Sequence, residues 1–392
     1  MKILMIAPTP MLPPTSGNRA RILSLVESLA GLGHEVHFMH VQRETGDTPA
    51  MHAALDGRYY PVGYTAPRNR YRQTLRRLAR RLGLDYGYRF AIDDWYDPAI
   101  DAHVRKLLTA IQPDAVMVEY VYLSRVLQQV PATVLKLIDT HDAFGNRHRR
   151  YRNRGRTAAW FSTAPAEEAR GLERADVVIA IQRNEADYFR TLVRRPVITV
   201  GHVVKLDGAA APVAGRRVLL VGSDNPINVD SFRHFMQHVV PLIRARVPDA
   251  EIAVAGTLCR AVTAAGVTLL GELDDLAPAY RSARVVVNPV LFGTGLKVKC
   301  VEALGYGKPL VTTRCGADGL ERAVPHALLM ADEPADFANA VALLLSDDAV
   351  AAGMVRAARR FATDWNHECL KELAACLRTT GARPASMAGA PA

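Results

Sequence analysis

Short apolar runs alternate with longer amphipathic stretches along the first half of the chain. Lys2–Ile6 and Glu35–His40 have the length of buried strands, and residues with the spacing of one helix face lie between them: Ile22, Leu25, Val26 and Leu29. A strand, a loop, a helix and a second strand in this order are typical of a doubly wound α/β unit. Further strands are expected at Asp114–Val118, Thr133–Asp139, Val177–Ile181 and Val197–Val200.

The alternation begins again after residues 206–216, which are small, glycine-bearing and poor in core residues, and which therefore predict a linker. Strands are expected beyond this linker at Val218–Val221, Glu251–Ala255, Val267–Leu270, Arg284–Asn288 and Leu310–Thr312. Helices are expected at about Val229–Arg246, at Phe337–Leu345, at Val350–Phe361 and in a last segment that begins at Trp365. The pattern predicts two doubly wound α/β halves.

We divide the chain into a first domain at 1–205, the linker at 206–216, a second domain at 217–363 and a final helix at 364–380. Residues 381–392 are small and include proline, so we expect a disordered tail. The length of 392 residues also favours two domains over one ordinary core.

Composition excludes several classes of protein. Hydrophobic residues make up 49% and charged residues 22%, as in ordinary globular proteins. No apolar run approaches the roughly 18–20 residues that span a bilayer, and the run Ile3–Ala7 is too short for a signal peptide, so we expect a cytoplasmic protein. The five cysteines show no CxxC spacing, which indicates reduced thiols rather than a zinc site.

The stretch Phe292–Leu320 carries the strongest chemical signal. A loop of Gly293, Thr294 and Gly295 leads into a predicted helix, and the first-turn N–H groups of such a helix can bind an anion. Lys297 and Lys299 add positive charge beside the loop, and Glu302, farther along the helix, could accept hydrogen bonds from ribose hydroxyls. A nucleotide diphosphate fits this chemistry. The alternative is an ordinary glycine-capped core helix with surface lysines.

This stretch resembles the donor-site motif of GT-B glycosyltransferases, above all the large retaining family four. That family usually carries two glutamates separated by seven residues. Glu302 matches the second glutamate, but Thr294 stands at the first, so the chain resembles the variant that reads GTGLKVK. The resemblance implies two Rossmann-like domains that face each other across a cleft, a final helix that crosses back to the first domain, and a UDP- or GDP-linked sugar donor.

The resemblance also assigns residues outside the central stretch. Gly17, in the first glycine-bearing loop, would approach the donor diphosphate from the opposite side, although a plain connecting loop is the alternative. Ser223 and Asn228 match the second phosphate loop, and backbone at Leu273 would contact the base. Leu296, next to Lys297, is the remaining residue that we predict to bind the donor.

His141 follows the predicted strand that ends at Asp139, and catalytic groups of open α/β sheets lie where strands end. The resemblance places a histidine near the donor sugar at this position. An imidazole there can bond a sugar hydroxyl or relay a proton. The alternative is a structural histidine bonded to the neighbouring carboxylates.

Positive charge gathers in the first half. Residues 1–200 hold 29 Lys and Arg against 20 Asp and Glu, a net charge of +9, which leaves +1 for residues 201–392. Two segments stand out: 68–83, where arginines surround a stripe that includes Leu78 and Leu82, and 146–156, with six arginines in eleven residues. The residues proposed for an acceptor or an anionic membrane surface are Arg76, Arg77, Arg80, Arg81, Arg149 and Arg150.

Both basic segments also allow a plainer interpretation. The helix at 68–83 could pack on its own domain through the leucine stripe, and the run at 146–156 could be solvated and disordered.

These features predict transfer of a sugar from a nucleotide-diphosphate donor to a hydroxyl of a glycan or lipid-linked acceptor, in polysaccharide or glycolipid biosynthesis. The resemblance favours retention of configuration. We expect no metal and no cofactor, because helix N–H groups and lysine can meet the diphosphate charge. The alternatives are an epimerase of the same fold, a soluble small-molecule or protein acceptor, and a nucleic-acid-binding protein. The last lacks support, since no basic motif interleaved with aromatic residues occurs.

Overall fold

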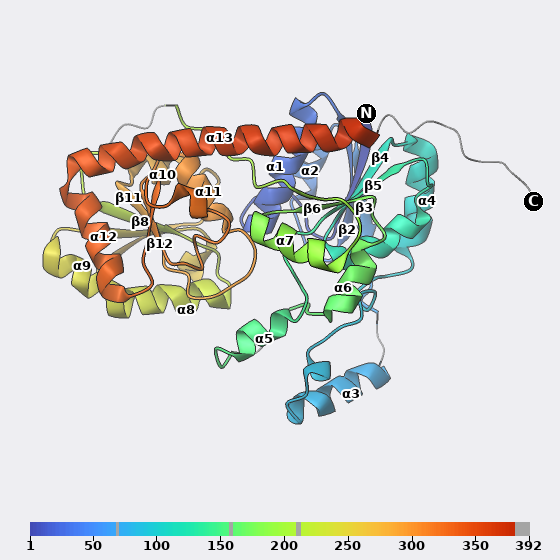
Figure 1. Ribbon diagram of the computed structural model, residues 1–392, viewed down its shortest axis with the longest axis horizontal. Helices are drawn as coiled ribbons and strands as arrows, with labels where there is room; N and C mark the ends of the chain where they lie inside the picture. The colour runs from blue at the N-terminus through green and yellow to red at the C-terminus, as the bar shows by residue number, and fades with distance from the viewer. Residues whose placement is uncertain (68–69, 157–159, 209–212, 381–392) are drawn as a thin grey trace, which may run out of the picture.

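The computed structural model of the chain describes residues 1–67, 70–156, 160–208 and 213–380. Two α/β domains lie side by side, and one long helix, α13 (Asp348–Thr380), crosses both of them (Figure 1). Two small elements, α3 and α5, project from the opposite side of the molecule (Figure 1). The predicted architecture of two doubly wound domains with a helix that returns to the first is confirmed.

The first domain is built on a parallel sheet of seven strands in the order β3-β2-β1-β4-β5-β6-β7. Its strands are β1 (Lys2–Ala7), β2 (Glu35–Gln42), β3 (Tyr59–Gly63), β4 (Ala115–Glu119), β5 (Leu135–Asp139), β6 (Val177–Ala180) and β7 (Val197–Thr199). Its helices are α1 (Gly17–Gly31), α2 (Thr48–Leu55), α3 (Arg70–Arg81), α4 (Ile100–Ile111), α5 (Arg147–Arg152), α6 (Pro165–Leu172) and α7 (Arg183–Leu192), with short 3₁₀ segments η1 (Asp85–Gly87) and η2 (Val121–Gln129).

The second domain has a parallel sheet of six strands in the order β10-β9-β8-β11-β12-β13. Its strands are β8 (Arg217–Val221), β9 (Glu251–Ala255), β10 (Val267–Gly271), β11 (Val285–Asn288), β12 (Leu310–Thr312) and β13 (Leu328–Met330). Its helical elements before α13 are α8 (Pro226–His234), the π-turn η3 (Phe235–Val239), α9 (Val240–Arg246), η4 (Thr257–Arg260), α10 (Ala277–Ser282), α11 (Val298–Gly305), η5 (Glu321–Ala323) and α12 (Pro334–Ser346).

The apolar runs are continuous because both faces of each sheet are covered. Along β1, Leu4 and Ile6 belong to one core cluster, whereas Ile3, Met5 and Ala7 belong to the cluster on the other face. Successive strand side chains point to opposite faces, so a strand buried on both sides has no polar alternation.

Helix α13 departs from the sequence analysis, which placed a break between residues 361 and 365. The helix is continuous because residues 362–364 include neither proline nor glycine. Ala358 and Ala362 pack in the second domain, and Leu373 and Leu377 pack in the core of the first. A single rigid element therefore contributes to both cores.

The expected tail at 381–392 and part of the expected linker, 209–212, lie outside the described residues. Within the described part of the chain, no single helix is long and apolar enough to cross a membrane, although α12 and α13 pass by length and composition when taken together across their 100° bend.

Candidate donor and catalytic site

A cavity of about 540 Å³ lies between the two domains, and residues from both domains line it. It gathers almost every residue that the sequence analysis assigned to donor binding or catalysis: Gly17, His141, Ser223, Asn228, Leu273, Gly293, Thr294, Leu296, Lys297 and Glu302. Gly295 is absent from the cavity wall. A side chain there would begin 3.2 Å from the carbonyl oxygen of His141, and its φ of +72° also favours glycine. Gly295 therefore lets the donor loop approach the first domain.

Lys297 holds the glycine loop in a compact form. Its ammonium group donates to the carbonyl oxygens of Thr294, at 3.2 Å, and Gly295, at 2.7 Å. Helix α11 begins at the next residue, so the loop and the start of the helix line the same cavity. A glycine loop that leads into a helix start is the kind of geometry that binds anions in other proteins.

Lys299 joins the two loops that were assigned to the diphosphate. Its ammonium group donates to the Asn228 side chain at 3.0 Å, and the Asn228 amide donates to the carbonyl oxygen of Ser223 at 2.9 Å. Burial lowers the pKa of Lys299 to about 8. Burial likewise raises the pKa of Glu302, which also lines the cavity, to about 7. A bound diphosphate would restore favourable surroundings for the lysine charge.

Thr294 makes the most direct contact between the domains. Its hydroxyl donates to the Asp142 carboxylate at 2.6 Å and accepts from the Arg147 guanidinium at 3.1 Å, while Arg147 and Asp142 form an ion pair at 3.0 Å. The resembled family has a glutamate at this position. In this chain Thr294 occupies it, and its hydroxyl connects the loop before α11 to the segment after β5.

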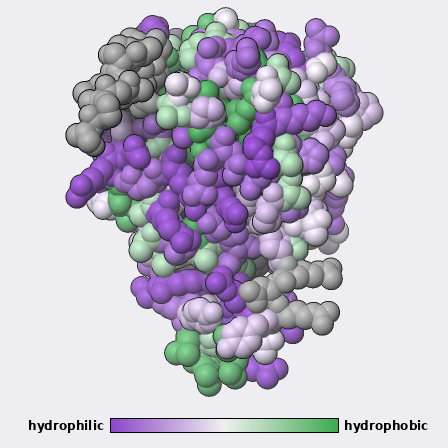
Figure 2. Space-filling view, turned by 90° about the vertical axis from the view of Figure 1, so that its right-hand side faces the viewer, coloured by the Kyte–Doolittle hydropathy of each residue, from purple (hydrophilic) through white to green (hydrophobic). Residues whose placement is uncertain are grey.

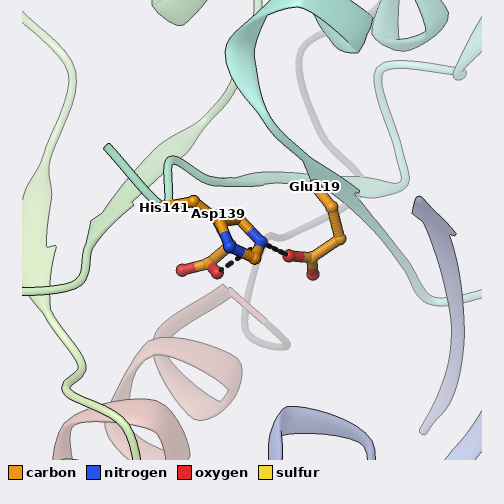
Figure 3. Close-up of side chains that lie close together, drawn as sticks. All are labelled: Glu119, Asp139 and His141. Carbon is orange, nitrogen blue, oxygen red and sulfur yellow. Dashed lines mark hydrogen bonds and ion pairs between the residues drawn. The ribbon is translucent and has the colours of Figure 1, made fainter. Parts of the chain in front are cut away.

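His141 lies at the end of β5 with a φ of +58°, and its ring stacks on Tyr120 with 4.1 Å between ring centroids. Figure 3 shows its Nε2 atom directed at two buried carboxylates, Glu119 at 2.5 Å and Asp139 at 3.4 Å. Burial and the Asp139 charge raise the pKa of Glu119 to about 7. The histidine therefore lines the cavity while its ring is held in place by carboxylates.

Arg21 neutralises the buried cluster. Burial alone would raise the pKa of Asp139, but the Arg21 charge and its hydrogen bonds outweigh burial and hold this pKa below its usual value. Among the described residues, ligand atoms of Glu119, Asp139 and His141 lie within 4.8 Å of one another, close enough for a metal ion. Arg21 already donates to both Asp139 oxygens, so a cation there would meet an adjacent guanidinium.

Residues 215–347 match the family model described as Glycosyl transferases group 1. The fold is shared with solved structures. Sucrose-phosphate synthase from Thermosynechococcus elongatus is 17% identical with a TM-score of 0.66, over 97% of this chain and all of that chain. A TarM mutant from S. aureus is 11% identical with a TM-score of 0.67, over 96% and 99% of the two chains. HepE from Anabaena is 14% identical with a TM-score of 0.60, over 95% and 99%. No curated protein matches the sequence.

The chain has the GT-B fold, and its second domain carries a glycosyltransferase group 1 domain.

The cavity wall includes residues that the sequence analysis did not assign. Tyr120, Trp160, Arg21, Asp142 and Arg147 line the cavity beside the assigned residues. The sequence offered a reason to assign Asp142 and Arg147 to the site. Asp142 directly follows His141, and Arg147 is the first arginine of the basic run at 146–156. Arg21 carried none, since an arginine in a predicted helix is usually solvated.

The structure differs from the plainer interpretation of each basic segment. In α3, Arg76 is paired with Asp94 and Arg80 donates to the carbonyl oxygen of Gly87, so both are tied to their own domain. The alternative in which α3 packs through its leucine stripe is wrong, because Leu78 and Leu82 are 54% and 65% exposed.

Within the run at 146–156, residues Arg147–Arg152 form helix α5 rather than a disordered solvated segment. Arg149 pairs with Asp85, and Arg147 reaches the cavity. Among the described residues, no ion pair or hydrogen bond of the Arg77, Arg81 or Arg150 side chain is found.

Replacement of Lys297 or Glu302 by alanine is expected to weaken UDP binding. Lys297→Ala removes a hydrogen-bond donor to the diphosphate, and Glu302→Ala removes an acceptor for the ribose hydroxyls. Loss of one such hydrogen bond to a charged group lowers affinity by roughly tenfold or more. Isothermal titration of the folded variants measures the effect, and Lys106→Ala, an exposed change on α4, is the matched control. Unchanged affinity in both variants would remove the 293–302 stretch from the nucleotide site.

Replacement of Thr294 by valine keeps the side-chain shape but removes the contact with Asp142. We expect turnover to fall about tenfold or more, because a hydrogen bond to a charged group is lost, while Thr294→Ser stays within about twofold of wild type by the same reasoning. Steady-state kinetics with a thermal melt of each variant test this. Equal turnover of the valine and serine variants would contradict a positioning role for the hydroxyl.

Proposed function

We propose that this glycosyltransferase moves a sugar from a UDP- or GDP-linked donor to a hydroxyl of a glycan or lipid-linked acceptor held by the first domain. The main support is that the two loops assigned to the donor diphosphate lie beside each other. The loop after β8 and the loop before α11 meet through Lys299 and Asn228 at one cavity. A cationic, helix-start site of this kind suits a diphosphate that gains charge as it leaves.

The proposed reaction separates the sugar from the diphosphate through an oxocarbenium-like state. Lys297, Lys299 and the α11 N–H groups would stabilise the departing charge, so the proposal includes neither a metal nor a cofactor. His141 would bond a sugar hydroxyl or relay a proton at the cavity wall. Retention of configuration is the stereochemistry we propose, on the strength of the resemblance to family four.

Similar structures support a uridine nucleotide. TarM was solved with UDP and alpha-GlcNAc-glycerol, HepE with UDP and glucose, and a pneumococcal O-GlcNAc transferase with UDP and GlcNAc. UDP is therefore our first choice of nucleotide for this chain. The first domain contributes Tyr120, Trp160 and Arg147 to the cavity wall, and we propose that the acceptor binds against them. An epimerase would not need such a wall.

A panel of nucleotide sugars scored by thermal shift tests the donor directly, because a ligand that binds the folded state raises its apparent stability. We expect UDP-sugars to raise the melting temperature more than GDP-sugars, and turnover to persist in EDTA. A panel without any shift would refute the donor site. Complete loss of turnover in EDTA, restored by magnesium or manganese, would refute the metal-free mechanism.

We also propose that the first domain docks on an anionic membrane from the cytoplasmic side. The projecting tip, formed by α3 and η1, exposes Leu78, Leu82, Leu84, Tyr71 and Tyr86. Figure 2 shows hydrophobic side chains gathered at the lower end of the molecule, where Figure 1 places α3. Apolar side chains flanked by exposed arginines suit the interface of an anionic bilayer.

Liposome sedimentation tests this docking. Binding should require anionic lipid and fall as salt rises, because salt screens surface charge. Leu78→Gln with Leu82→Gln should weaken binding, as should Arg77→Gln with Arg81→Gln, by about 1 kcal/mol for each arginine. Arg190→Gln with Arg195→Gln, two exposed arginines on another face, is the matched control. If the wild-type protein does not bind anionic vesicles at low salt, the result would favour a soluble acceptor.

A further inference from the structure

A second hollow adjoins the donor cavity. It has a volume of about 460 Å³ and lies between the segment after α5 and helix α8. Phe292 forms part of the wall of both spaces, and the Tyr151 ring packs edge-on against it with 5.7 Å between ring centroids. An extended ligand could therefore reach both the hollow and the reaction cavity past one aromatic side chain.

The wall of this hollow is strongly cationic. Arg154, Arg156 and Arg233 line it, together with two histidines of α8 and η3. Among the described residues that line the hollow, the one carboxylate is Asp230, which is paired with Arg156 at 2.9 Å and lies 4.0 Å from Arg233. The wall of the hollow therefore holds three arginines and one aspartate, and its net charge is +2 when both histidines are neutral.

The two histidines reinforce this arrangement. The rings of His234 and His238 lie 4.7 Å apart, centroid to centroid. Burial and the neighbouring His238 lower the pKa of His234, as expected when like charges meet. Neutral imidazoles still donate N–H bonds, so the site can offer donors as well as charge.

We propose that this hollow binds an oxyanion group of the acceptor, a phosphate or diphosphate, while the acceptor hydroxyl lies in the adjoining cavity. The inference rests on the proposed function. It names the acceptor class as phosphate-bearing, because planar guanidinium groups bind phosphate in a bidentate manner. The donor diphosphate has its own loops on the other side of Phe292, so the hollow serves a second anion.

Two features distinguish this site from an ordinary solvated patch. The hollow is concave, so several cations can contact one ligand at once. Within the described residues, the Arg154 side chain forms no ion pair or hydrogen bond, and so its charge is available. The Arg156–Asp230 pair also joins the first domain to the second, so the hollow is formed by both domains together.

The experiment uses the full chain saturated with UDP, which fills the donor site, and titrates it with inorganic pyrophosphate. Isothermal titration should detect one further site. Arg154→Gln with Arg233→Gln should weaken pyrophosphate binding about tenfold or more, since two charged contacts are lost, and should leave UDP affinity unchanged. Arg216→Gln with Arg246→Gln, a pair of exposed arginines outside both hollows, removes the same charge as a control.

The outcomes are distinct. Absence of pyrophosphate binding to the UDP-loaded wild type, or equal weakening by both variant pairs, would overturn the inference. Loss of binding in the first pair alone would support it. Failure of the wild type to bind UDP or GDP would instead overturn the proposed function, and the first titration step shows this before pyrophosphate is added.

Discussion

The buried ion pair between Arg21 and Asp139 constrains the site and the path of the chain together. Arg21 donates to both carboxylate oxygens of Asp139, at 3.2 and 2.9 Å, and to the carbonyl oxygens of Val200 and Gly201, at 2.8 and 2.5 Å. It therefore joins helix α1, the end of β5 and the segment that leaves the first domain. Loss of one partner would leave an uncompensated buried charge, which typically costs about 3–5 kcal/mol.

The chemistry of the cavity follows from this pair. Because Arg21 compensates Asp139, a second carboxylate, Glu119, can lie beside His141 in the same buried cluster. The backbone after Asp139 then turns through the positive φ of His141 and presents Asp142 to Thr294. The donor loop of the second domain is thus aligned by a chain of contacts that begins in the core of the first. An active site formed in this way depends on the fold of both domains.

Local features could be predicted from the sequence, whereas contacts between distant residues could not. The apolar runs predicted the strands of both sheets except the edge strands β3 and β13, because a buried strand shows in its local sequence. The anion site at 293–295 with Lys297 was inferred from local sequence in the same way and stays a prediction. The Arg21–Asp139 pair joins residues 118 positions apart, and nothing in their local sequence indicates it. The stripe with Leu78 and Leu82 was recognised as a helix face, but periodicity does not reveal whether such a face is covered. The structure leaves it exposed.

Helix α13 determines whether the two domains can be separated. The family model ends at residue 347, one position before this helix begins, yet the helix supplies Leu373 and Leu377 to the first domain's core. Trp365, midway along it, donates to the carbonyl oxygen of His202 at 2.8 Å, and any side chain at Gly201 would collide with its ring. The domain recognised by sequence is therefore smaller than the unit that folds. A first domain cut from the chain at the linker would lack a wall of its own core, so the two halves cannot be exchanged as independent modules.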